Sequence, residues 1–122
     1  MSKKILIVDD SGTSVMMARM VLSQENYTVA TARDGQEGVD VALVERPDLI
    51  LMDVVMPRLD GFEATKLLRA QDETRETPIL LVTTRGEEAN VERGYLAGCT
   101  DYICKPFNAV ELLAKVKNYL AG

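Results

Sequence analysis

The sequence contains no histidine and no tryptophan, and only two of its 122 residues are cysteines. Without histidine, the chain cannot hold a Ser-His or Cys-His nucleophile pair, an imidazole metal ligand or a phosphohistidine. Cys99 and Cys104 therefore cannot form a Cys/His zinc site. We expect both to be small packed residues rather than a disulfide, because the cytoplasm, where we place the chain, disfavours disulfides.

Long apolar runs and clusters of positive charge are also missing. Residues Met1–Lys4 precede only four apolar residues, too few for a signal peptide, and no stretch approaches the length of a transmembrane helix. The net charge is −5, and the lysines and arginines are scattered along the chain. This distribution of charge argues against a face that binds nucleic acid and against binding to an anionic membrane surface. We therefore expect a cytoplasmic protein that neither inserts into a membrane nor binds nucleic acid directly.

The sequence does contain a regular alternation of short apolar runs and amphipathic segments. Its 122 residues suffice for one domain with a sizeable core, and 47% of them are apolar. Five strands are predicted, at residues 5–8, 27–32, 49–53, 78–83 and 100–104. Five helices are predicted, at about residues 14–24, 35–45, 61–70, 87–97 and 109–120.

The hydrophobicity of the strands indicates their order in a sheet. The first, third and fourth strands are continuously apolar, as in a parallel sheet buried on both faces, whereas the second and fifth are mixed. Mixed strands at the two edges give the order 2-1-3-4-5, which is that of the flavodoxin-like fold. The predicted fold class is therefore α/β, a three-layer (βα)5 domain with a parallel five-stranded sheet covered by helices.

Polar side chains follow the predicted strands at the edge where this fold binds its ligands. The residues at these strand ends are Asp9 and Asp10, Asp53, Thr83 and Lys105. Three carboxylates in a partly desolvated cleft repel one another, so such a cluster needs a cation. Oxygen ligands without histidine or cysteine suit a hard ion, and Mg²⁺ suits a site that leaves room for waters and a phosphate.

A carboxylate beside a metal ion, an ammonium group and a hydroxyl group is suited to phosphoryl transfer. Lys105 supplies the positive charge and Thr83 the hydroxyl donor. Catalysis of phosphoryl transfer consists mostly of positioning and charge stabilisation. The acceptor would be an aspartate, which would form an acyl phosphate.

Four motifs at these positions resemble the receiver domain of two-component response regulators. In chain order they are Val8-Asp9-Asp10-Ser11, Met52–Pro57 with Gly61, Val82-Thr83, and Asp101–Phe107. The match covers the chain in order and at family spacing, so we expect residues 1–122 to form one receiver domain. The resemblance implies phosphorylation by a sensor histidine kinase or phosphotransfer protein and a downstream protein target or effector domain. It also implies that the chain catalyses only its own phosphotransfer and dephosphorylation.

The resemblance implies a role for each residue of the predicted site. Asp53 would accept the phosphoryl group, and Lys105 would pair with the phosphoryl oxygens. Asp10 would bind Mg²⁺ directly, Asp9 largely through a coordinated water, and Asp53 would be the third carboxylate ligand. The main-chain carbonyl of Val55 would complete the protein ligands, so its side chain need not be polar.

Two further residues would change position after phosphorylation if the resemblance holds. Thr83 would move towards the phosphoryl group, and Tyr102 would turn inward as the neighbouring surfaces repack. Phosphorylation would be a local change of charge, and a change of this kind shifts the balance between two conformations of a structural element. The peptide bond before Pro106 would be cis.

Some positions depart from the pattern of the family. A basic residue is frequent early in the first helix, where this chain has Val15, Met16 and Met17. They are either packed residues or an unusually apolar docking surface for the kinase. Val55 and Arg85 cannot orient a hydrolytic water, which predicts a long-lived phosphorylated Asp53 unless both are merely solvated loop residues.

Three other functions fit the sequence less well. A flavodoxin-type cofactor binder could use Ser11–Ser14 as a phosphate loop, but Asp9 and Asp10 would repel the phosphate, and aromatic residues to stack on a flavin are few. An aspartyl-phosphate phosphatase would need a cap domain, which the length does not leave, and a second acid two residues after the nucleophile. A phosphorylation-independent interaction module usually lacks a site residue, whereas all five are present here.

Overall fold

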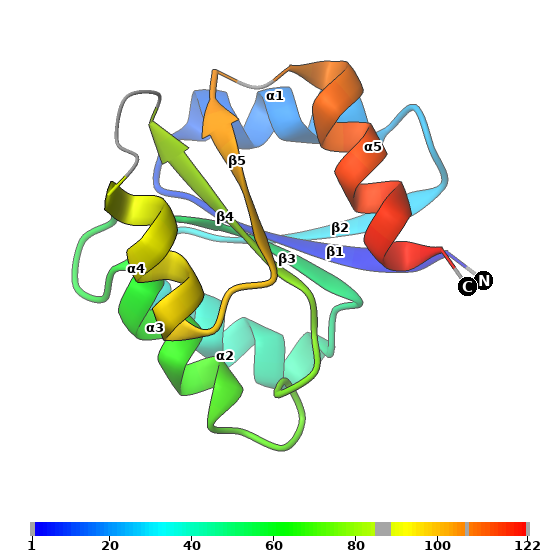
Figure 1. The fold of residues 1–122 in the computed structure, drawn as a ribbon. Helices are drawn as coiled ribbons and strands as arrows, with labels where there is room; N and C mark the ends of the chain where they lie inside the picture. The colour runs from blue at the N-terminus through cyan, green and yellow to red at the C-terminus, as the bar shows by residue number, and fades with distance from the viewer. Residues whose placement is uncertain (1, 85–88, 107, 122) are drawn as a thin grey trace.

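The computed structural model describes residues 2–84, 89–106 and 108–121. The strands are β1 (Lys3–Val8), β2 (Tyr27–Ala32), β3 (Leu49–Asp53), β4 (Ile79–Thr84) and β5 (Asp101–Lys105). The helices are α1 (Gly12–Leu22), α2 (Gly35–Glu45), α3 (Gly61–Arg69), α4 (Ala89–Ala97) and α5 (Ala109–Leu120). Strands and helices alternate along the chain (Figure 1), so the predicted sequence of elements is confirmed.

The five strands form one parallel sheet in the order β2-β1-β3-β4-β5. This confirms the order predicted from the hydrophobicity of the strands. Every residue of the central strand β3 is buried, whereas only Ala32 is buried in the edge strand β2. Figure 1 shows α1 and α5 on one face of the sheet and α2, α3 and α4 on the other. The carboxyl ends of all five strands therefore lie at one edge of the sheet.

The core has one layer on each face of the sheet. Side chains alternate along each strand, so Ile50 and Met52 of β3 pack towards α2, α3 and α4. Leu49 and Leu51 pack towards α1 and α5. Full burial of such a side chain stabilises the fold by about 2 kcal/mol, so these layers fix β3 and hold the residue at its carboxyl end in place.

Capping side chains set the ends of the helices. α1 begins at Gly12, two residues before the predicted start, because the Ser11 hydroxyl accepts a hydrogen bond from the Ser14 amide at 3.3 Å. α1 also ends two residues earlier than predicted, at Leu22. The predicted first residue of the fourth helix, Glu87, lies outside the described residues. Within the described part of the chain, no helix has both the length and the apolar character needed to cross a membrane.

The two cysteines are free thiols. Cys99 is buried beneath α4, and Cys104 is half-buried on β5. Burial, together with the nearby charge of Asp101, raises the pKa of Cys99 to about 11. The thiol of Cys99 therefore stays protonated and packs as a small apolar side chain, as predicted.

Candidate functional site

The carboxyl ends of β1, β3 and β5 bring four charged side chains together. One carboxylate oxygen from each of Asp9, Asp10 and Asp53 lies within 4.8 Å of the others. The Lys105 amine, from β5, lies 2.9 Å from Asp9 Oδ2 and 3.5 Å from Asp53 Oδ2. Asp9 and Asp53 are buried, whereas Asp10 is exposed. Three acids thus lie together with one ammonium group, which pairs with two of them, and this leaves an excess of negative charge when all are ionised.

The charge balance of this cluster shifts the pKa of two groups. Burial raises the pKa of Asp53 to about 6, and the adjacent charge of Asp9 adds to the effect, while Lys105 opposes it. Burial alone would lower the pKa of Lys105, but its contacts with Asp9 and Asp53 outweigh burial and raise it above its ordinary value. At neutral pH Asp53 is therefore mostly ionised and Lys105 is charged.

The backbone around Asp53 is held by close contact with α3. The amide of Gly61 donates a hydrogen bond to the Val54 carbonyl at 3.0 Å. A Cβ atom at position 61 would collide with the carbonyl oxygen of Asp53, so only glycine fits there. The amide of Val54 donates to the Val82 carbonyl of β4 at 3.2 Å. These contacts fix the direction in which Asp53 leaves the sheet.

The loop between β1 and α1 holds Asp9 in a similar way. Its amide donates to the Ala32 carbonyl of β2 at 3.0 Å, and its Oδ1 accepts a hydrogen bond from the Ser11 amide at 2.9 Å. The other carboxylate oxygen, Oδ2, is the one that pairs with Lys105. Asp9 therefore connects the start of α1 with the cluster at the end of β3.

The other residues predicted for the site lie around this cluster. Thr83 is buried, and its hydroxyl lies 3.8 Å from Cys104 Sγ. Val55 follows Asp53 in the loop after β3, with a side chain that is 68% exposed. The peptide bond between Lys105 and Pro106 is cis. Arg85, which was predicted to affect hydrolysis, lies outside the described residues.

Tyr102 lies on β5, and the two methionines lie on α1. Tyr102 is half-buried on β5, three positions before Lys105. Met16 and Met17 are 56% and 41% exposed. The structure therefore excludes complete burial of these methionines in the core and leaves much of their surface open on α1.

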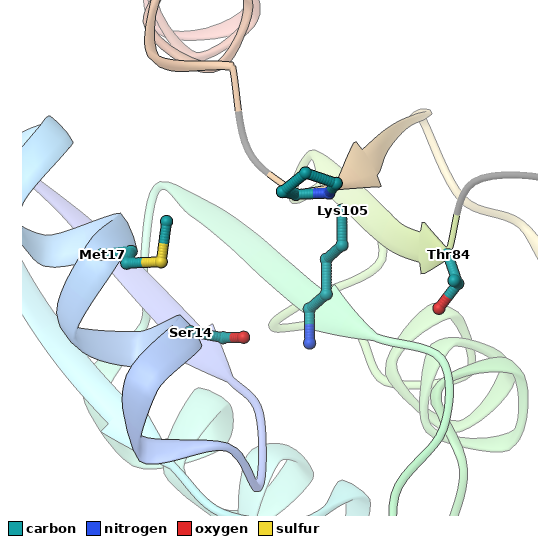
Figure 2. Close-up of a pocket in the computed structure, with 5 residues that line it drawn as sticks. Ser14, Met17, Thr84 and Lys105 are labelled. Atoms are coloured by element: carbon teal, nitrogen blue, oxygen red, sulfur yellow. The ribbon is translucent and has the colours of Figure 1, made fainter.

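A pocket of about 370 Å³ lies next to Lys105, between α1 and the ends of β4 and β5. It is lined by Ser14, Met17, Thr84, Lys105 and Pro106. Figure 2 shows the Lys105 amine between Ser14 on one side and Thr84 on the other. Ser14 was not predicted as part of the phosphorylation site, although its place in the first turn of a helix that follows Asp9 and Asp10 was a usable signal.

A second cavity, of about 200 Å³, borders the acidic cluster on the side of β2. Its lining includes Asp9, Asp10, Thr31 and Arg33. The acidic cluster therefore has space beside it as well as an excess of negative charge. A donor set made only of oxygen atoms, with one exposed acid, fits a hard divalent cation that keeps several of its waters.

The site and fold were compared with known proteins. The family model of the response regulator receiver domain matches residues 5–117. The chain is 40% identical to protein PilH of Pseudomonas aeruginosa over 119 residues, which cover 98% of each protein. It is 43% identical over 117 residues to the transcriptional regulatory protein ResD of Bacillus subtilis, covering 96% of this chain but 48% of ResD. The chain thus spans about half the length of some curated relatives and nearly all of others.

A solved structure with a similar fold adds information about the cleft. It is the receiver domain of the sensor histidine kinase PA1611 from Pseudomonas aeruginosa, described with a magnesium ion coordinated in the active-site cleft. The TM-score is 0.92, the sequence identity is 33%, and the alignment covers 100% of both chains. This similarity extends over the whole sheet and all five helices.

Proposed function

This chain belongs to the family of response regulator receiver domains, and we propose that Asp53 accepts a phosphoryl group in a reaction that depends on Mg²⁺. The observation that carries the proposal is the convergence of Asp9, Asp10 and Lys105 on the Asp53 carboxylate. Homology to PilH and to other response regulators supports a role in phosphorylation-dependent signalling. Beyond this role, we propose Asp53 as the phosphorylated residue, Mg²⁺ as the metal ion and a phosphohistidine as the phosphodonor.

The residues that would hold Mg²⁺ are the carboxylates of Asp9, Asp10 and Asp53, with the main-chain carbonyl of Val55. The excess of negative charge and the adjacent space support this assignment. When bound, the ion would stabilise the negative charge on the transferring phosphoryl oxygens. The magnesium ion described in the receiver of PA1611 supports the same choice of metal.

The chain's own residues would carry out the transfer as follows. An oxygen of the ionised Asp53 attacks the phosphorus atom of a phosphohistidine on a sensor kinase or phosphotransfer protein. The phosphorus–nitrogen bond breaks, the imidazole leaves with its electron pair, and an acyl phosphate forms on Asp53. Lys105 exchanges its contact with the Asp53 carboxylate for one with the phosphoryl oxygens. Because the pKa of Asp53 is about 6, the carboxylate is available as a nucleophile at neutral pH.

The signal would then leave the site through a change in packing. Thr83 would move its hydroxyl towards the phosphoryl group, and Tyr102 would turn inward, altering a surface that binds a downstream protein target or effector domain. The chain would act in the cytoplasm and would catalyse only its own phosphotransfer and dephosphorylation.

Intact-protein mass spectrometry with acetyl phosphate tests the proposal. The wild-type protein should gain one phosphoryl group in the presence of MgCl₂ and little or none with EDTA. Asp53→Ala should remove the gain. Asp72→Ala, which removes an acid that is 87% exposed and distant in the chain from the strand ends, should retain it. A gain that survives Asp53→Ala would contradict the assignment of Asp53, and no gain in the wild-type protein would favour a phosphorylation-independent interaction module.

A further inference from the structure

One carboxylate at the amino end of β5 joins side chains from two helices and a main-chain amide of its own strand. Asp101 Oδ1 accepts hydrogen bonds from the Tyr102 amide at 2.8 Å, from Lys115 Nζ at 3.1 Å and from the Tyr95 hydroxyl at 3.4 Å. Asp101 Oδ2 accepts one from the Tyr119 hydroxyl at 2.8 Å. Tyr95 belongs to α4, whereas Lys115 and Tyr119 belong to α5. We call these five residues the Asp101 cluster.

Two members of the Asp101 cluster contact the ring of Tyr102. The ring of Tyr95 meets it edge to face, with 6.3 Å between the ring centroids and an angle of 88° between the planes. The Lys115 amine lies 5.4 Å from the centroid of the Tyr102 ring. Both groups are hydrogen-bonded to Asp101, so the position of this carboxylate determines where they lie against the ring.

The protonation states of the Asp101 cluster match this arrangement. Burial would raise the pKa of Asp101, but the hydrogen bonds from the Tyr102 amide, Tyr119 and Lys115, with the charge of Lys115, outweigh burial and hold the pKa below its ordinary value. Burial, with the charge of Asp101, raises the pKa of Tyr95, and the hydrogen bond to Asp101 raises that of Tyr119. At neutral pH the carboxylate is therefore ionised, and both hydroxyl groups keep the protons that they donate.

The Asp101 cluster and the phosphorylation site share one strand. Asp101 is the first residue of β5 and Lys105 is the last, so they lie about 13 Å apart along the strand. Cys104, which contacts the Thr83 hydroxyl, projects from the same face of β5 as Tyr102, because side chains alternate along a strand. Tyr102 lies two residues before Cys104 on β5. A change in packing that begins at Thr83 can therefore reach Tyr102 through Cys104.

We propose that Asp101 and Lys115 are positioning residues that hold the Tyr102 ring in its resting position. Tyr102 can turn only when its contacts with Tyr95 and Lys115 are given up, so the cluster sets how readily the protein switches. The inference rests on the proposed function in one respect, since it takes phosphorylation of Asp53 as the event that moves Tyr102.

The test places 3-fluorotyrosine at position 102 and records ¹⁹F spectra of the resting protein in H₂O and in D₂O. The difference between the two solvents measures the exposure of the ring. Asp101→Asn and Lys115→Met should each displace the resonance and change this solvent difference by at least a third. The double variant should change it no more than the larger single variant, because both substitutions break the same contact. Lys115→Arg should restore the wild-type spectrum.

Lys117→Met is the matched control. Lys117 is also on α5 and forms an ion pair, 3.3 Å from Glu25, but it belongs to no contact of the Asp101 cluster. Lys117→Met should leave the Tyr102 resonance unchanged. If Asp101→Asn and Lys115→Met fold and yet give the wild-type resonance and solvent difference, the positioning role is wrong.

Mass spectrometry of the same samples after treatment with acetyl phosphate and MgCl₂ separates the two proposals. If the wild-type protein takes up no phosphoryl group, the proposed function fails, while the resting spectra still decide whether Asp101 and Lys115 position the ring. If it does take one up, the Tyr102 resonance of the resting variants should be displaced towards that of the phosphorylated wild type. Displacement away from it would also overturn the inference.

Discussion

The two ends of β5 each carry a lysine–carboxylate cluster, and the two clusters have opposite balances of donors and acceptors. At the carboxyl end, Lys105 pairs with Asp9 and Asp53 while a third acid, Asp10, lies beside them, and burial with the charge of Asp9 raises the pKa of Asp53 to about 6. At the amino end, Asp101 alone accepts hydrogen bonds from four donors, and its pKa lies below the ordinary value. The same pair of residue types thus occurs in two opposite electrostatic settings.

The difference shows that the number of donors around a carboxylate decides what an ion pair can do. Where acceptors are in excess, burial makes the ionised state costly, and a cation is needed to relieve the repulsion. Where donors are in excess, the carboxylate is saturated, and its hydrogen bonds fasten the elements that supply them. One end of β5 is suited to chemistry and the other to holding a conformation.

The largest expected effect is on the pH dependence of stability at the Asp53 end. The pKa of Asp53 rises from an ordinary 3.8 to about 6 in the folded protein. The folded state therefore binds more protons than the unfolded state between these values, and this group makes stability fall as the pH rises from about 4 to 6. With solvent screening taken into account, this decline amounts to about 1 to 3 kcal/mol at neutral pH.

Urea unfolding of the wild type and of Asp53→Asn at a series of pH values measures this effect. Asp53→Asn should be more stable than the wild type at pH 7 and should lose the decline between pH 4 and 6. If both proteins show the same pH dependence, the repulsion around Asp53 is absent. The contrast between the two clusters of β5 would then be wrong for the cluster at its carboxyl end.

The next effect is stabilisation by Mg²⁺. An ion that binds only the folded state adds about 1.4 kcal/mol to the free energy of unfolding at ten times its dissociation constant. Thermal unfolding with increasing MgCl₂ should show this gain in the wild type and in Asp101→Asn, but a much smaller gain in Asp10→Asn. Equal gains in all three proteins would indicate that the ion binds elsewhere.

A smaller effect of opposite sign is expected from neutralising the saturated carboxylate. Asp101→Asn should lower the free energy of unfolding at pH 7 by about 1 kcal/mol, because charged hydrogen bonds are lost. Since the pKa of Asp101 is lowered on folding, its contribution is present above its ordinary value and lost as the pH falls through the folded-state value. The deficit of the variant should therefore shrink in strong acid, and a deficit that stays constant with pH would count against the electrostatic explanation.

The smallest expected effect concerns the lifetime of the phosphorylated protein. Val55→Asn places an amide beside Asp53 that can orient a water, so decay of the phosphoprotein should become severalfold faster. Val110→Asn is the matched control, since Val110 is 79% exposed against 68% for Val55. The decay is followed by mass spectrometry after the phosphodonor is removed. Equal acceleration in both variants would mean that the effect is not local to the site.

The sheet and the charged cluster at its edge could be predicted from the sequence. Continuous apolar runs separate inner strands from edge strands, and parallel strands place their carboxyl ends at one edge. It follows that Asp9, Asp53 and Lys105, each at the end of a predicted strand, lie together, as the structure has them. The predicted start of α1 was wrong by two residues because the capping hydroxyl is that of Ser11, directly before Gly12, and its end, at Leu22, also came two residues before the predicted one.

The Asp101 cluster could not be predicted in this way. Tyr95, Lys115 and Tyr119 come from two helices whose rotation about their own axes decides which polar side chains reach β5. The apolar stripe of α5 shows which face of the helix is buried, but it does not show which group the amine of a lysine at its border contacts. The closer approach of Lys105 to Asp9 than to Asp53 likewise depends on side-chain geometry, because both acids lie within its reach.

The close fit of Gly61 against the carbonyl of Asp53 has a mechanical consequence. α3 starts directly on the backbone that bears Asp53, and its position 61 has no side chain that could yield, so this joint is rigid. β5 reaches the Asp53 carboxylate through the side chain of Lys105, a flexible tether. We therefore expect a change of charge at Asp53 to reach β5 through Lys105 without requiring α3 to move.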